Sequence, residues 1–143
     1  MTNNGITLVD DEDYLFLSLL TVSESYDGYA TVHGSDRVRI HRIIMEAPKG
    51  SHVDHINGDK LDNRKSNLRI CTAQQNGANS RIGKNNTSGY KGVTWNKRRK
   101  LWQAQIMVAR KNINLGVFSD PKEAHAAYVS AANDNFGEFA RAM

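Results

Sequence analysis

The sequence of 143 residues has a single cysteine, Cys71, and no long hydrophobic run. One cysteine excludes an internal disulfide and a zinc site built from clustered cysteines. Without an apolar run of membrane-spanning length, and with an acidic N-terminus unlike a signal peptide, the chain is predicted to be soluble and intracellular, with no membrane partner. Cys71 lies in the apolar segment Leu68–Cys71. We expect it to be a small buried side chain there.

Positive charge is scarce in the first third of the chain and concentrated in the rest. Residues 1–50 hold eight acidic and four basic side chains, residues 51–89 hold three and six, and residues 90–143 hold four and nine. Basic middle and C-terminal parts favour contact with a polyanion. A solvated basic surface would give the same distribution, so charge alone leaves both interpretations open.

The stretch VDHINGDKLDNRKSNLRICTAQQN contains four side chains that can act on a phosphodiester: Asp54, His55, Asn67 and Asn76. His55 titrates near neutrality and can deprotonate water. Asp54 and Asn76 offer oxygen ligands suited to magnesium, which binds few protein groups and keeps several waters. Asn67 can fix the tautomer of the imidazole by a hydrogen bond. The alternative is a polar loop of turn-forming residues between two strands.

The order Asp-His, INGD, LDNR, SNLR and QQN resembles the HNH nucleases with a ββα-metal site, in particular the phage and intron-type HNH homing endonucleases. The resemblance implies metal ligation by Asp54 and Asn76, a general base at His55, and orientation of this base by Asn67. Asn76 stands where the motif's name has His, as in the homing-enzyme branch. The implied cofactor is Mg²⁺, with Mn²⁺ as the alternative. The implied substrate is double-stranded DNA and no small molecule, and a phage or mobile element is the implied source.

One geometric problem comes with this motif. Consecutive residues of an ideal strand point to opposite faces of the sheet. Asp54 and His55 must therefore lie at a strand end or distortion, or approach the scissile phosphate from different sides. His33, His41 and His52 are weaker candidates, because none matches a metal or base position of that family and a lone histidine is usually an ordinary hydrogen-bonded or surface residue.

The residues before the motif are predicted to form a small antiparallel sheet that packs against it. Residues 1–13 are polar, acidic and expected to be frayed, and residues 14–22 form a compact apolar run. A strand is predicted at residues 28–32. Residues 37–47 begin as a strand and continue as a short helix that ends before Pro48. After the motif's second strand, a helix is predicted to begin at Ala73.

The C-terminal part has a different pattern. Residues 83–89 contain no apolar side chain and indicate a linker. Three strands are predicted at residues 90–96, 101–109 and 113–118, followed by a helix from Pro121 with Asp120 as its N-cap. Alternation along the strands predicts a buried set that meets the helix, namely Val93, Trp95, Trp102, Ala104, Ile106, Ile113 and Leu115.

The opposite sheet face is rich in amides and rimmed by cations, a surface suited to groove edges and phosphates. This half resembles an AP2 DNA-binding domain through YKGVTW, LWQAQI, NLGVF and EAHAAYVSAANDNFGEFA. Outward positions that are often Arg in that family are Thr94, Asn96, Met107 and Asn112 here. The residues expected to contact DNA are Arg81, Lys84, Lys91, Thr94, Asn96, Lys97, Arg98, Arg99, Lys100, Gln103, Gln105, Arg110, Lys111, Asn112 and Asn114.

Together these patterns predict an α+β protein. Residues 1–80 form a ββα-metal HNH nuclease module with N-terminal antiparallel strands, residues 81–89 form a linker, and residues 90–143 form a small AP2-like domain. The predicted function is metal-dependent DNA endonuclease activity. The alternative is a catalytically inactive DNA-binding regulator that keeps the HNH-like part as a remnant. An RNA-directed role is less favoured, because no exposed sheet face shows an aromatic stacking platform.

Overall fold

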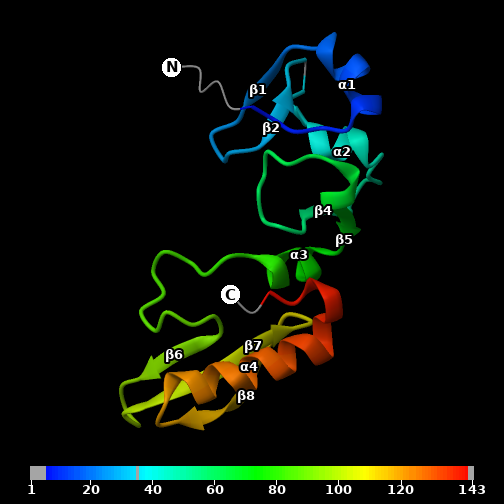
Figure 1. The fold of residues 1–143 in the computed structure, drawn as a ribbon. Coiled ribbons are helices and arrows are strands. Elements are labelled where there is room, and N and C mark those ends of the chain that lie inside the picture. Colours follow the sequence, from blue (N-terminus) through cyan, green and yellow to red (C-terminus); the bar gives the residue numbers. More distant parts are fainter. Residues whose placement is uncertain (1–5, 35, 142–143) are drawn as a thin grey trace. The chain divides into compact units, whose positions relative to one another are not determined.

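The computed structural model describes residues 6–34 and 36–141 (Figure 1). The chain forms two compact units, residues 1–73 and residues 74–143. The helix that follows the HNH-like hairpin falls mainly in the second unit. The domain boundaries expected at residues 80 and 89 stay a prediction. Among the described residues, no helix has the length and apolar character needed to cross a membrane.

Among its described residues, the first unit contains two small antiparallel sheets and two α-helices. One sheet has the order β1-β2-β3 and the other pairs β4 with β5. Its elements are α1 (Asp11–Ser18), β1 (Val22–Glu24), β2 (Ala30–Val32), β3 (Val38–Arg39), α2 (Ile40–Ile44), β4 (His52–His55), the 3₁₀ turn η1 (Lys65–Asn67) and β5 (Leu68–Cys71).

A single apolar cluster joins the two sheets of this unit. Ala30 from β2 and Ile40 from α2 pack with Val53 from β4 and Leu68 from β5, and Leu17 of α1 completes the cluster. All are buried, and Ile40 is 0% exposed. The predicted packing of the N-terminal strands against the motif is therefore confirmed. This shared core holds the motif's hairpin in a fixed place.

Helix α1 was missed by the sequence prediction, which treated residues 1–13 as frayed. Residues 1–5 lie outside the described part of the chain, but a helix begins at Asp11. Three acidic side chains fill its first turn, where they interact favourably with the helix dipole. The first turn is also tied to the η1 region, because Lys65 N donates to Asp10 Oδ2 at 2.7 Å and Lys65 Nζ lies 2.5 Å from Glu12 Oε1.

The second unit has a three-stranded antiparallel sheet backed by a long helix (Figure 1). The strand order is β6-β7-β8. Its elements are α3 (Ala73–Asn79, which begins at the last residue of the first unit), β6 (Val93–Asn96), β7 (Leu101–Val108), β8 (Lys111–Phe118), α4 (Pro121–Phe136) and the 3₁₀ turn η2 (Gly137–Phe139). The three strands, the helix and the start of α3 at Ala73 agree with the sequence prediction.

Helix α4 begins and packs as its sequence indicates. The Asp120 side chain accepts a hydrogen bond from Lys122 N at 2.8 Å, and Pro121 occupies the first turn. Small residues let the helix lie close to the sheet. At Gly92 the approach is so tight that a Cβ atom would come within 2.0 Å of the Tyr128 ring. Gly92 also has φ +74°, so glycine is required at this position for two reasons.

The faces of the sheet follow the predicted alternation with two exceptions. Ala104 and Ile106 of the central strand β7 are buried against the helix side. Trp95 and Ile113 were predicted to be buried but are 44% and 43% exposed. Both lie on the edge strands, which a single helix does not cover fully. Trp95 is partly covered because its ring packs edge-on against Trp102, with centroids 4.9 Å apart.

Candidate active site

The β4–β5 hairpin places Asp54 and His55 side by side at its end. Asp54 pairs with Arg69 across the ladder, and His55, the last residue of β4, pairs with Leu68. Asp54 is 4% exposed and His55 is 5% exposed. The two side chains meet different neighbours: the carboxylate meets Arg69, and the imidazole meets Tyr29 just before β2, His41 of α2 and Asn63 of the loop after β4. This answers the geometric problem posed by their adjacency in the sequence.

The imidazole of His55 is held by Asn63. The distance from His55 Nε2 to Asn63 Oδ1 is 3.1 Å, and Asn63 is 1% exposed. Asn63 Nδ2 donates to Thr7 Oγ1 at 2.8 Å, which turns the amide so that its oxygen meets the ring. An amide oxygen only accepts hydrogen bonds, so the proton of neutral His55 lies on Nε2 and the lone pair on Nδ1.

Two further rings enclose His55. The ring centroid of His41 lies 5.0 Å from that of His55, and the centroid of Tyr29 lies 5.9 Å from it. Tyr29 and His41 also contact each other at 5.3 Å. Burial lowers the pKa of His55 below its usual value, although the Asn63 hydrogen bond and nearby carboxylates offset part of this effect. The fold therefore favours the neutral imidazole, the form that accepts a proton.

Asn67 organises the loop between the strands. Its Oδ1 accepts from Asn57 N at 3.0 Å, and its Nδ2 donates to Asn57 Oδ1 at 3.1 Å and to Asp62 O at 2.8 Å. The sequence had suggested that Asn67 orients His55 directly. In the structure the side-chain hydrogen bonds of Asn67 go to the loop, and Asn63 makes the contact with the imidazole. The spacing of the motif gave no means of choosing between these two asparagines.

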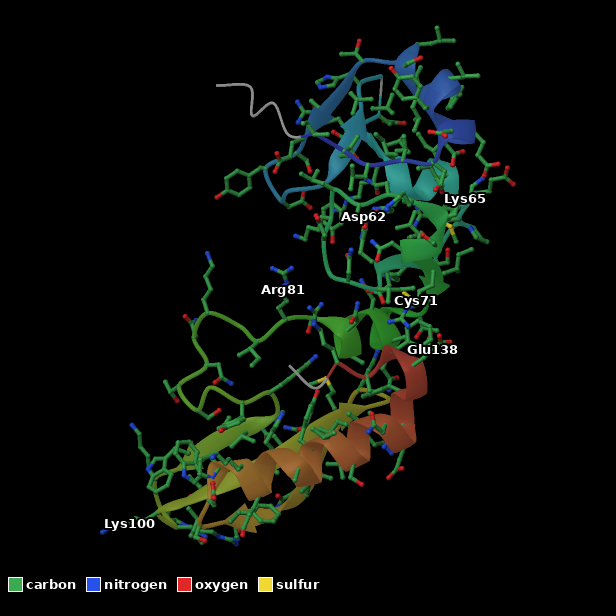
Figure 2. All side chains as sticks on the ribbon, in the orientation of Figure 1. Asp62, Lys65, Cys71, Arg81, Lys100 and Glu138 are labelled. Carbon is green, nitrogen blue, oxygen red and sulfur yellow. The ribbon has the colours of Figure 1, made fainter. Side chains whose placement is uncertain are left out.

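The same loop is fixed by a buried carboxylate, Asp62, which is labelled in Figure 2. Arg64 Nε and Nη2 each donate to this carboxylate at 2.8 Å, and Asn57 Nδ2 donates to it at 2.9 Å. The hydrogen bond from Arg64 is the main reason that the pKa of Asp62 falls to about 2. Asp62 therefore stays ionised, and it holds the loop that presents Asn63 to His55.

Asp54 is the buried carboxylate closest in sequence to the general-base candidate. Arg69 Nε and Nη2 both contact its Oδ2, at 2.9 and 2.8 Å. The Arg69 side chain is 13% exposed, so the pair is largely removed from water. No group of three or more His, Cys, Asp or Glu side chains among the described residues could hold a metal ion. The chemistry here fits a hard cation held by one carboxylate and by substrate oxygens, as Mg²⁺ is often held.

Asn76 is the fourth residue of α3, as the sequence predicted, and it is partly buried. It belongs to the second unit, whereas Asp54, His55 and Asn67 belong to the first. Its role as a metal ligand stays a prediction. Asn79, one turn later, is 8% exposed.

Most of the residues expected to contact DNA lie on the exposed parts of the second unit. The polar sheet face is ordered by amide pairs: Asn96 Nδ2 donates to Gln103 Oε1 at 3.0 Å, and Asn112 Nδ2 donates to Gln105 Oε1 at 3.3 Å. Lys100 lies at the turn between β6 and β7 (Figure 2). The exposed members of the set are Arg81, Lys84, Thr94, Lys97, Arg98, Arg99, Lys100, Arg110, Lys111, Asn112 and Asn114, and the partly buried ones are Lys91, Asn96, Gln103 and Gln105.

Lys91 differs from the other cations in this set. Its Nζ donates to Ala78 O at 2.5 Å and to Ser80 O at 2.6 Å, at the end of α3. Burial, together with the charge of Arg141, lowers the pKa of Lys91 to about 8. Lys91 thus joins α3 to the loop before β6. These contacts favour a structural role over the predicted phosphate contact.

The sequence analysis did not identify Tyr29, Asn63 or Arg69 as site residues, and it treated His41 as an ordinary histidine. Tyr29 and His41 come from segments far from the motif, and only the folded structure brings them to His55. Arg69 had a detectable signal, because alternation places it opposite Asp54 in an antiparallel pair. Asn63 had none, since a loop without a repeating geometry sets its direction.

Comparison with known proteins agrees with the geometry. A family model described as HNH endonuclease matches residues 38–78. Protein 3.8 of Escherichia phage T7 is 35% identical over 108 residues, which cover 72% of this chain and 88% of the phage protein. The protein named "Uncharacterized HNH endonuclease L560" of Acanthamoeba polyphaga mimivirus is 34% identical over 123 residues, which cover 79% of this chain and 61% of the viral protein. No solved structure matches the chain.

The hairpin that carries Asp54 and His55 lies within the matched residues 38–78, and the chain belongs to the HNH endonuclease family. Membership implies nuclease activity on DNA, and HNH nucleases generally use a divalent metal. The match to the phage protein spans 108 residues, more than either unit contains. The similarity therefore includes parts of both units.

Proposed function

We propose that the protein is a homing-endonuclease-like HNH nuclease that hydrolyses phosphodiester bonds of double-stranded DNA, with His55 as the general base. The observation that carries the proposal is the hydrogen bond from His55 Nε2 to the buried Asn63. In a neutral imidazole with its proton on Nε2, the basic nitrogen that accepts a proton from water is Nδ1. We expect the protein to act inside cells, as one borne by a phage or mobile element.

Four other residues of the first unit support His55 in this proposal. Asn63 fixes the tautomer and the direction of the ring, and Asn67 holds the loop that carries Asn63. Tyr29 and His41 enclose the ring and keep it neutral by excluding water. A base held in this way needs little reorganisation when the substrate is bound, which is the usual contribution of a preorganised site.

Asp54 and Asn76 are the proposed ligands of a divalent cation, Mg²⁺ or Mn²⁺. When bound, the cation would neutralise charge on the scissile phosphate and on the leaving oxygen. Asp54 suits this role because it is a buried carboxylate beside the base. Arg69 holds its Oδ2 and so fixes the direction of the carboxylate.

The second unit is proposed to position the DNA as an AP2-like domain. The basic turn of Lys97, Arg98, Arg99 and Lys100 and the cations Arg81, Lys84, Arg110 and Lys111 would contact phosphates. The amide face of Thr94, Asn96, Gln103, Gln105, Asn112 and Asn114 would meet base edges in the major groove. The cross-strand amide pairs support this role because they fix the side chains before binding.

Incubation of the purified protein with supercoiled plasmid tests the function. We expect nicked or linear DNA with Mg²⁺ or Mn²⁺ and no cutting with excess EDTA. A His52→Ala variant, which changes an exposed histidine three residues before His55, should cut as the wild type does. A mock preparation excludes contaminating nucleases. Plasmid that stays supercoiled with every divalent ion tested, although the protein binds it, would instead support the inactive regulator.

A further inference from the structure

Two cations lie over the ring of Tyr29 in the first unit. The guanidinium carbon of Arg39 is 4.2 Å from the ring centroid, and Nζ of Lys60 is 4.5 Å from it. Tyr29 directly precedes β2, Arg39 ends β3, and Lys60 lies in the loop after β4. Three separate segments thus bring two positive charges to one aromatic ring. Such contacts are favourable even when the cations remain partly in water.

Asp27 holds both cations in place. Arg39 Nη2 lies 2.6 Å from Asp27 Oδ2, and Lys60 Nζ donates to the Asp27 carbonyl oxygen at 2.7 Å. The hydrogen bond from Ser25, followed by the charge of Arg39, lowers the pKa of Asp27. The ionised Asp27 and the two cations together carry one net positive charge. Because the long side chains are already ordered, binding a ligand costs them less conformational entropy.

Both cations keep hydrogen-bond donors for a ligand. Asp27 accepts one of the five N–H groups of Arg39 and one of the three N–H groups of Lys60. The Arg39 side chain is 44% exposed, and Lys60 is exposed. Exposed and fixed cations with spare donors suit the oxygens of a phosphodiester, which form charge-assisted hydrogen bonds with such groups.

The position of these cations relative to His55 suggests which phosphate they meet. The Tyr29 ring that carries them lies 5.9 Å from the imidazole ring of His55. Phosphates of one DNA strand follow each other at steps of about 3.4 Å along the helix axis. A strand whose scissile phosphate lies at His55 would therefore bring a neighbouring phosphate to the cations.

We propose that Arg39 and Lys60, held over Tyr29, grip a backbone phosphate that flanks the scissile bond. The ligand class is the phosphodiester of a nucleic-acid strand. The inference rests on the proposed function, since His55 marks the place of cutting. The grip fixes the strand next to the base, whereas the cations of the second unit hold the duplex through a different part of the chain.

Binding to a short DNA duplex in EDTA, where no cutting occurs, tests the grip. Each phosphate contact contributes about 0.9 to the slope of log affinity against log salt. Lys60→Met and Arg39→Met should each reduce the slope by about 0.9, and each should weaken binding about tenfold at 0.1 M salt. Lys49→Met, which removes an exposed lysine of the same unit, is the matched control and should leave the slope unchanged.

Stability measurements separate the grip from a purely structural ion-pair network. Thermal melts followed by circular dichroism check the fold of each variant, and Arg39→Lys keeps the charge if Arg39→Met unfolds the protein. Arg39→Lys should retain the salt slope. An unchanged slope in folded Lys60→Met, and in Arg39→Met where that variant folds, would overturn the proposal, because the cations would then serve only the fold.

Replacing a phosphate beside the mapped cut with a neutral methylphosphonate tests which phosphate Arg39 and Lys60 contact. Wild-type protein should bind this DNA about as weakly as Lys60→Met binds native DNA, and combining the two changes should cause no further loss. Full additivity of the two losses would overturn the placement beside the cut. If the wild type binds with the expected slopes but never cuts DNA, the grip is supported as a binding site while the proposed function fails.

Discussion

The two units bury different kinds of side chain. Among the described residues, the buried polar and charged side chains all lie in the first unit except Asn79. The core of the second unit is Val93, Ala104 and Ala124, and its amides lie on the sheet face. Burial of hydrogen-bonded polar groups costs stability but fixes them in direction and charge state. The first unit is therefore suited to cleaving a phosphodiester bond, and the second unit is suited to binding the surface of a DNA duplex.

Apart from loss of the general base itself, the largest expected effect comes from removing the charge of Asp54. Asp54→Asn keeps the shape of the side chain but removes the anionic ligand, so metal-dependent cleavage should fall by at least about 100-fold. Binding of Mn²⁺, measured by calorimetry, should weaken in parallel, and DNA affinity in EDTA should not fall. Full cleavage by a folded Asp54→Asn variant would show that the metal is held elsewhere.

Alanine variants of Asn63 and Asn67 should distinguish the orientation of the His55 ring from the stability of the loop. Asn63→Ala removes the hydrogen bond to His55, and we expect single-turnover cleavage to fall about 10- to 100-fold. Asn67→Ala removes three hydrogen bonds, so it should lower the free energy of unfolding by about 1–3 kcal/mol or more. This loss should exceed that of Asn63→Ala. Chemical denaturation and cleavage assays measure the two effects.

A reversed order would contradict these assignments. If Asn67→Ala spared stability but lowered cleavage more than Asn63→Ala, then Asn67 would act on the base directly.

Acid should destabilise the first unit more than the second through His41. Burial, followed by repulsion from His55 and nearby arginines, lowers the pKa of His41 from 6.5 to about 3. As the pH falls, His41 therefore binds a proton in the unfolded chain before it does so in the folded chain. The contribution of neutral His41 to the free energy of unfolding is fully present above pH 6.5. It is lost as pH falls from 6.5 towards 3, by about 1.4 kcal/mol per pH unit.

Urea denaturation at several pH values measures this loss. His41→Phe should flatten the decline between pH 6.5 and 5, because one titrating group is removed. The same slope in His41→Phe and wild type would show that His41 does not cause it.

Lys91 provides a smaller effect within the second unit. Lys91→Met removes two hydrogen bonds to the end of α3, so it should lower stability by about 1–2 kcal/mol and leave the salt dependence of DNA binding unchanged. Lys122→Met, which removes an exposed lysine of α4, is the control and should alter neither quantity. A salt slope reduced by about 0.9 in Lys91→Met would instead support the phosphate contact predicted from the sequence.

The amide face of the second unit should show the smallest single effects. Gln103→Ala and Gln105→Ala should each weaken DNA binding only a few-fold, because a typical hydrogen bond contributes about 0.5–1.5 kcal/mol. Stability should stay within about 0.5 kcal/mol of wild type. Asn133→Ala, on the exposed part of α4, should change neither. A Gln103→Ala variant that abolished binding would place the main determinant of affinity on this face.

Patterns with a regular period were predictable from the sequence. The alternation of β7 and the capping residues of α4 gave the strands and helix of the second unit, and family resemblance located Asp54 and His55. Two kinds of feature were not predictable. The direction of Asn63 depends on a loop held by Asp62 and Asn67, and contacts of Tyr29 with His55 depend on tertiary packing. The burial of Trp95 and Ile113 was predicted wrongly, because alternation gives the sheet face on which a side chain lies but not how much of that face the helix covers.

Single-turnover cleavage by His55→Ala tests the central claim most directly. The account predicts a rate about 10²- to 10⁴-fold below wild type, unchanged DNA affinity, and partial recovery when imidazole is added to the buffer. Cleavage by His55→Ala at the wild-type rate would contradict the claim that His55 is the general base.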